Sequence, residues 1–115
     1  MRYGIAMLSA LLALAAPAAA HHGWGSYLAD KPVTVSGPIL TARFENPHAV
    51  ITVRASDAVW TVILAPTSRM TSRGATARVV AAGKTVSAFG YPSRTEKDEM
   101  RAERIIIDGK TYEMR

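Results

Sequence analysis

The sequence predicts an all-β domain, namely a small OB-fold-like Greek-key barrel of five to six strands with a short helix between strands 3 and 4. Three observations lead to this prediction. Stretches rich in β-branched residues recur along the chain, turn residues separate them, and one stretch with helical spacing interrupts them after the third. Closing five strands into a barrel also removes the exposed edges that a small sheet has. An open antiparallel sandwich is the alternative.

The first strand is expected to begin near Val33, where apolar and polar residues alternate with a period of two. One face carries Val33, Val35, Ile39 and Thr41, and the other carries Thr34, Ser36 and Ala42. The dipeptide Gly37-Pro38 lies inside this strand and indicates a bulge or a sharp bend. Asn46-Pro47 marks the turn that follows.

Two further strands are expected over 49–55 and 58–64, joined by a hairpin at Ser56-Asp57. Pro66 then opens a helical stretch, with Thr67 or Ser68 as its cap and a short helix or two helical turns within 68–82. The remaining segments, 85–91, 100–107 and 111–114, have the composition of strands. Asp108-Gly109 is a strong hairpin signal between the last two.

The first twenty residues have the layout of a secretory signal peptide. Met1-Arg2 is a short positive start, an apolar run covers 5–16, and Ala18-x-Ala20 is a cleavage motif. The run is shorter than the roughly 20 residues that an uncleaved membrane anchor, the alternative reading, needs. We therefore expect residues 1–20 to be a cleaved signal peptide, 21–31 an N-terminal arm and 32–115 a single OB-like β-barrel domain. The mature chain contains no stretch resembling a membrane span and is expected in the periplasm.

Composition excludes several classes of protein. A chain of 115 residues is too short for a multidomain enzyme, and the absence of cysteine excludes a disulfide scaffold and a thiolate metal site. The formal charge of +5 would suit a nucleic-acid partner, but export separates the protein from nucleic acid. The few acidic residues form no recognisable catalytic pair. We therefore expect a binding module rather than an enzyme, without a nucleic-acid partner.

Several motifs make the chain similar to a family of small exported bacterial proteins of unknown function. They are HHGW after the signal, KPVTVSG, FENPH, Trp60 in a strand, and the segments 65–69, 90–92 and 100–104. The resemblance covers most of the mature chain and implies a periplasmic β-barrel with no assigned activity. The chain departs from the family at Phe44, where tryptophan is common, and at Leu64, where many members have glutamate.

Three histidines are the candidate metal ligands: His21, His22 and His48. Cleavage after Ala20 makes His21 the first residue, so its amine and imidazole can chelate one metal ion while His48 supplies a third nitrogen. An all-nitrogen site of this kind suits Cu(II). Cleavage after Ala18 or Ala19 also leaves a histidine in a chelating position, with a different geometry. The imidazoles must be neutral to bind, as they are near neutral pH.

Other interpretations of these residues stay open. The histidine pair can be incidental in an exposed terminus, and His48 can simply begin a strand. The alternative function is an OB-type module that binds a small molecule, a glycan or an envelope protein without a metal, with the arm as a clamp. Glu45 and Asn46 can orient His48 or only form a turn. Trp24, Tyr27, Phe44 and Trp60 can form a ligand platform, although the neighbours of Trp60 favour a core position. Arg101, Glu103 and Arg104 are expected on a solvated face.

Overall fold

The computed structural model describes residues 23–115, so the expected signal peptide and the candidate ligands His21 and His22 lie outside the described residues. The elements, in chain order, are η2 (Trp24–Ser26), β1 (Val33–Arg43), β2 (Val50–Ala55), β3 (Ala58–Ile63), α1 (Thr67–Ser72), β4 (Thr85–Pro92), β5 (Glu99–Ile107) and β6 (Lys110–Glu113). Among residues 23–115, no helix is long and apolar enough to cross a membrane.

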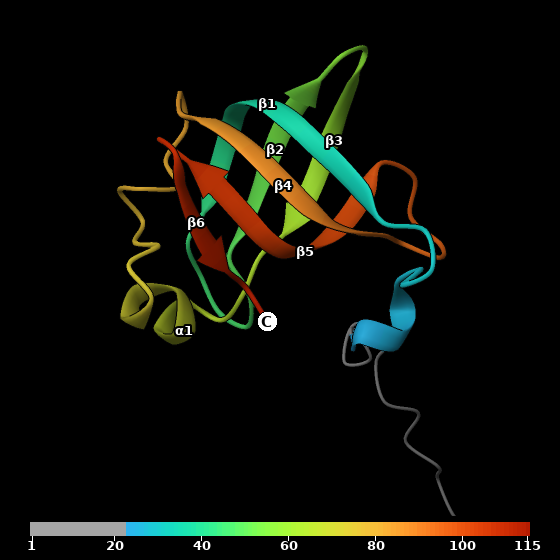
Figure 1. The fold of residues 1–115 in the computed structure, drawn as a ribbon, viewed down its shortest axis with the longest axis horizontal. Helices are drawn as coiled ribbons and strands as arrows, with labels where there is room; N and C mark the ends of the chain where they lie inside the picture. The colour runs from blue at the N-terminus through green and yellow to red at the C-terminus, as the bar shows by residue number, and fades with distance from the viewer. Residues whose placement is uncertain (1–22) are drawn as a thin grey trace, which may run out of the picture.

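The strands form a closed barrel, which Figure 1 shows from the side. Their order is β3-β2-β1-β4-β5-β6, and a parallel pairing of β3 with β5 closes the ring of five. Strand β6 pairs with β5 as an extra strand, and α1 is the connection between β3 and β4. This is the strand order and helix position of an OB-fold, so the predicted fold class is confirmed.

The bend predicted at Gly37-Pro38 is where β1 changes partner. Residues 33–38 of β1 pair with β4, whereas Ile39 and the residues after it pair with β2. A Cβ atom at Gly37 would overlap the carbonyl oxygen of Arg54 in β2, so only glycine allows the two backbones to approach this closely. The bend therefore lets one long strand belong to both halves of the barrel.

The sequence placed Thr41 on the same face of β1 as Ile39, and this part of the prediction is wrong. The register shifts between Ile39 and Thr41, so Ile39 is buried while Thr41 faces outward and shares a hydrogen bond of 2.6 Å with Thr52. A bulge reverses the alternation of side chains beyond it, because the side-chain period of a strand is two.

Helix α1 occupies only the first part of the range 68–82, within which the sequence predicted a short helix or two helical turns. Gly74 has a φ of +85°, and the N–H of Ala75 donates to the carbonyl of Met70 at 2.8 Å. The N–H of Gly74 donates to the carbonyl of Thr71, which completes a Schellman motif. Because glycine takes this left-handed conformation readily, α1 ends after six residues, and residues 73–83 form turns and irregular backbone.

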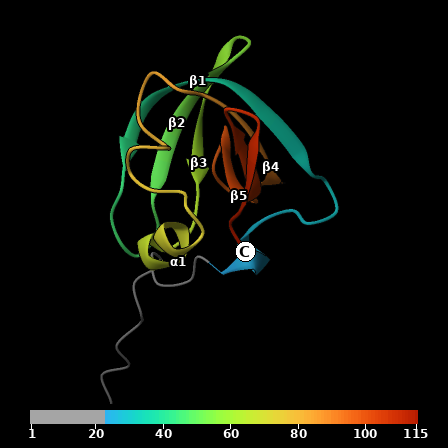
Figure 2. The same ribbon diagram turned by 60° about the vertical axis from the view of Figure 1, so that its left-hand side comes forward.

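The barrel interior is filled by alternate residues of the strands. Ile51, Val53, Val62, Ala88, Met100 and Ile105 are among the side chains that are fully buried. Helix α1 adds Met70, which seals one end of the barrel. Figures 1 and 2 show α1, η2 and the last residues of the chain at the same end, opposite the β2–β3 hairpin.

Candidate functional site

The N-terminal arm is fixed to the barrel by backbone hydrogen bonds. The N–H of Leu28 donates to the carbonyl of Pro92 at 2.9 Å, and the N–H of Arg94 donates to the carbonyl of Ser26 at 3.0 Å. The side chain of Arg94 also donates to the carbonyl of Gly25 at 2.8 Å. The arm is thus held against the end of β4 and the loop after it.

The indole of Trp24 contacts two cations, which together form the Trp24 clamp. The guanidinium carbon of Arg101 lies 4.1 Å from the ring centroid, and that of Arg115 lies 4.5 Å from it. The ring of Tyr91 meets the indole edge-on, with 6.0 Å between centroids. Contacts between a guanidinium and an indole are favourable because the cation faces the electron-rich ring, and burial strengthens them. Trp24 is therefore one of the residues that hold the arm against the barrel.

Arg101 lies on the outer face of β5 but is only 6% exposed. Its position is set by the strand register. One row of paired residues runs across β1, β2, β3, β5 and β4 and consists, in that order, of Arg43, Val50, Ile63, Arg101 and Tyr91. Burial lowers the pKa of the Arg101 guanidinium below its ordinary value, Tyr27 opposes this change, and Arg69 and Arg115 add to it. The arm therefore covers a cation that strand alternation alone would leave exposed.

Tyr27 is the second anchor of the arm and is 2% exposed. Its hydroxyl donates a long hydrogen bond of 3.5 Å to the carboxylate of Glu99, at the start of β5. Burial, together with the neighbouring Glu99 charge, raises the pKa of Tyr27 from 10.0 to about 12, while Arg101 acts in the opposite direction. The phenol is therefore kept protonated beside the carboxylate.

His48 meets Arg101 at the edge of this covered region. The Nε2 atom of His48 lies 3.2 Å from Nη2 of Arg101. A guanidinium has donors only, so in this contact Nε2 is the acceptor and the neutral imidazole carries its proton on Nδ1. One guanidinium thus contacts both the indole of Trp24 and the imidazole of His48.

The β1–β2 loop, residues 44–49, carries His48 and is fastened on both sides. After His48, the N–H of Ala49 donates to the carbonyl of Ala65, and its own carbonyl accepts from the N–H of Leu64, both at 2.9 Å. Before His48, the side-chain oxygen of Asn46 accepts two hydrogen bonds from Thr67 in α1. The imidazole therefore projects from a loop that is held by the residues directly after β3 and by the helix.

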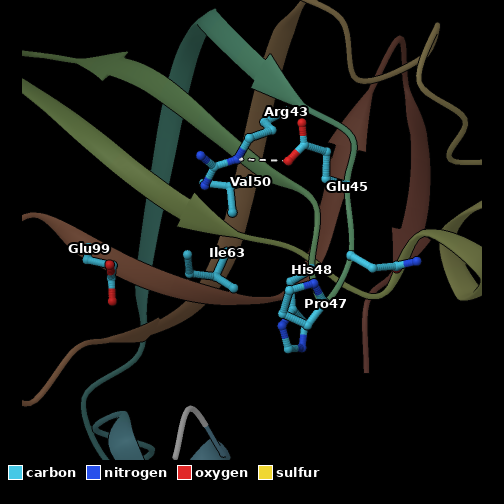
Figure 3. A pocket seen from close by; sticks show the side chains of 8 residues that line it. Arg43, Glu45, Pro47, His48, Val50, Ile63 and Glu99 are labelled. Carbon is cyan, nitrogen blue, oxygen red and sulfur yellow. Dashed lines mark ion pairs between the residues drawn. The ribbon is translucent and has the colours of Figure 1, made fainter. Parts of the chain in front are cut away.

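A pocket of about 270 Å³ lies beside the loop, on the outer face of the barrel. It is lined by Arg43, Glu45, Asn46, Pro47, His48, Val50, Ile63 and Glu99. In Figure 3, Ile63 lies between Glu99 on one side and His48 on the other, and the ion pair of 3.9 Å between Arg43 and Glu45 is drawn dashed. The lining combines apolar side chains with ionisable groups, a usual composition for a small-ligand site.

The structure describes one of the three predicted ligands, His48, because His21 and His22 lie outside the described residues. Within residues 23–115, no group of three or more His, Cys, Asp or Glu side chains is close enough to hold a metal ion. The predicted copper site therefore depends on the two histidines that precede Gly23, and it stays a prediction. Of the loop residues proposed to orient His48, Asn46 contacts Thr67 and Glu45 contacts Arg43.

Sequence reasoning missed Arg101. The expected solvated face of β5 holds for Arg104, which forms an exposed ion pair of 3.2 Å with Glu113. It is wrong for Arg101, which the arm buries. The alternation along β5 placed its side chain outside correctly, but no signal in that segment indicates that Trp24 covers it.

The strand order, the helix position and the pocket at the β1–β2 loop define the chain as an OB-type β-barrel domain. The family model "Family of unknown function (DUF6152)" matches residues 9–101, and the chain belongs to this family. The predicted resemblance to a family of unknown function is thereby confirmed. No curated protein sequence matches the chain.

A solved structure with a similar fold is the crystal structure of the ZRD-deleted mutant of TiaS in complex with agmatine. The two share 18% sequence identity with a TM-score of 0.54, over 73% of this chain and 26% of that one. The chain thus spans about a quarter of the length of that protein. At this identity the likeness shows a shared fold.

Proposed function

We propose that the mature chain is a periplasmic binding module, not an enzyme, that binds Cu(II) at the His48 end of the barrel. The proposed ligands are the terminal histidines His21 and His22 together with His48. Removal of residues 1–20 frees the amine of His21, and this amine and its imidazole chelate the ion together. The nitrogen-only donor set is one that Cu(II) favours.

The docked arm is the observation that carries this proposal. Trp24 and His48 both contact one guanidinium, that of Arg101. His22 is two residues from Trp24, and two residues of extended chain span at most about 7 Å. The hydrogen bonds of Gly25, Ser26 and Leu28 fix the chain on the other side of Trp24. These contacts support a terminal histidine that reaches the neighbourhood of His48.

The experiment is a competition titration with Cu(II) on protein purified with its native N-terminus. Native mass spectrometry reads both the first residue and the number of copper ions retained against a chelator. We expect a chain beginning at His21 to retain one ion, and His48→Ala to lose it to the same chelator. The matched control is the mature chain with its N-terminal amine acetylated, which keeps every side chain but removes the amine as a ligand. Equal affinity of this control and the native chain contradicts the proposal.

The pocket favours a second candidate function, the binding of a small organic molecule without a metal. OB-folds bind ligands on the outer face of strands 2 and 3 beside the loop between strands 1 and 2, which is where this pocket lies. In an amide NMR screen with a library of small fragments, a ligand of this pocket is expected to shift the signals of Val50 and Ile63. Ile63→Trp fills the pocket and should abolish those shifts, whereas Val59→Trp, at an exposed position near the start of β3, should not. Acetylation of the N-terminal amine leaves this binding unchanged, which separates the two functions.

A further inference from the structure

The contact between Arg101 and His48 uses the only lone pair of the neutral imidazole. A neutral imidazole has one N–H and one lone pair. In the described contact the lone pair is on Nε2 and accepts from Nη2 of Arg101 at 3.2 Å. The second nitrogen, Nδ1, therefore carries the proton and cannot take a metal ion or another electrophile in this state.

Binding of an electrophile at either nitrogen breaks this hydrogen bond. If the electrophile binds Nε2, it takes the lone pair that Arg101 uses. If it binds Nδ1, the proton must move to Nε2, where it faces the N–H groups of Arg101. Since arginine has no acceptor, the contact cannot be rebuilt with the opposite polarity.

Arg101 also belongs to the clamp on the arm. Its guanidinium lies 4.1 Å from the centroid of Trp24, and it is 6% exposed, so few alternative positions are open to it. Arg115 holds the same indole at 4.5 Å but has a more exposed side chain, which pairs with Glu103 at 3.6 Å. If Arg101 moves away from His48, its contact with the indole of Trp24 therefore changes as well.

We propose that Arg101 is a gate on His48. Its guanidinium occupies the imidazole lone pair, so a metal ion or other electrophile that binds His48 must displace Arg101. This displacement also changes the contact between Arg101 and the indole of Trp24. Arg101 is in this sense a positioning residue that fixes one tautomer of His48. The gate itself stands on the contact between the two side chains. Its extension to copper rests on the function proposed above.

The first test needs neither a variant nor a metal. Nitrogen-15 NMR of the histidine rings at about pH 8, where an imidazole is neutral, distinguishes the two tautomers. We expect His48 to carry its proton on Nδ1, with a lone pair on Nε2. A proton on Nε2 overturns the gate, because Arg101 cannot then donate to that atom.

The second test measures access to the lone pair with diethylpyrocarbonate, which acylates neutral imidazole nitrogens. Peptide mass mapping follows His48 separately from the other histidines. Loss of a hydrogen bond to a charged donor should speed the reaction of Arg101→Met by about tenfold. The matched variant Arg115→Met removes the other cation from Trp24 and leaves the contact to His48, so its rate should equal that of the wild type. Equal rates in all three proteins overturn the gate.

The third test repeats the comparison with Cu(II). If both proposals hold, Arg101→Met binds copper about tenfold more tightly than Arg115→Met, since the two variants weaken the Trp24 clamp alike but only the first removes the competitor. Copper binding with equal affinity in the two variants overturns the gate and leaves the copper function standing. Absence of copper binding in the wild type overturns the copper function, while the first two tests still decide the gate.

Discussion

Asn46 and Thr67 are joined by two hydrogen bonds to one oxygen atom. The backbone N–H of Thr67 donates to Oδ1 of Asn46 at 3.2 Å, and the hydroxyl of Thr67 donates to the same atom at 3.0 Å. Pro66, the residue at the N-cap of α1, has no side-chain hydrogen bond to the helix. The loop that carries His48 therefore supplies the cap that the helix lacks.

We expect Asn46→Ala to lower the free energy of unfolding by about 1 kcal/mol, the usual cost of losing a helix cap. Urea denaturation measures the change. The double variant with Thr67→Val should lose less than the sum of the two single changes, because the hydroxyl and the carboxamide share one interaction. Strict additivity would mean that the two side chains do not act together.

Trp24→Leu should release the arm while the barrel stays folded. Two cations contact one indole, and each such contact contributes about 0.5–2 kcal/mol, so the free energy that holds the arm on the barrel should fall by about 1–4 kcal/mol. Limited proteolysis with chymotrypsin, which cleaves after the otherwise buried Tyr27, should become faster. Phe89→Leu is the control, since it removes the contact with Arg104 at 5.1 Å but leaves the arm. Unchanged proteolysis of Trp24→Leu contradicts the clamp.

Tyr27 should make the protein sensitive to alkali. Its pKa is raised from 10.0 to about 12 in the folded state, so below pH 10 the phenol is protonated in both states. Between pH 10 and about 12 the unfolded chain loses this proton while the folded chain keeps it, and stability falls as the pH rises. Tyr27→Phe should flatten this fall in unfolding experiments across that window. An unchanged slope in the variant would show that Tyr27 is not its source.

Gly90→Ala should disturb the site through the backbone. A Cβ atom there would overlap the carbonyl oxygen of Arg101, and a backbone atom cannot move aside as a flexible side chain can. We expect a loss of about 1–3 kcal/mol in the free energy of unfolding, as for overpacking elsewhere. Gly25→Ala has no atom within 4 Å of its Cβ and should be neutral. Thermal melts of the two variants compare them directly.

The strands were predictable because side-chain alternation is a local property. Ile51, Val53 and Val62 follow the pattern of a pleated sheet with one buried face, and the structure buries all three. The end of the helix at Gly74 depends on a positive φ that a glycine permits but does not require. The outward turn of Thr41 depends on a bulge, which no residue type marks uniquely.

The site was less predictable because it joins parts of the chain that are distant in sequence. His48 could be singled out as a chemically versatile side chain, but its contact with Arg101 requires the pairing of β3 with β5. The burial of Arg101 requires Trp24, which lies on the arm before the first strand. Local patterns contain no information on such contacts, so the sequence marked the histidine and not the arginine beside it.

The parallel pairing of β3 with β5 has a consequence for the dynamics of the protein. It comprises three residue pairs, Thr61 with Glu99, Val62 with Met100 and Ile63 with Arg101, and it joins strands that α1 and β4 separate in the chain. A short non-local pairing is entropically costly to form, so it is expected to form late in folding and to open first under native conditions. Two of its residues are Glu99, which binds Tyr27, and Arg101, which binds Trp24 and His48. Hydrogen exchange at this seam should therefore report on the N-terminal arm, since one opening event exposes the strand amides and detaches both aromatic anchors together.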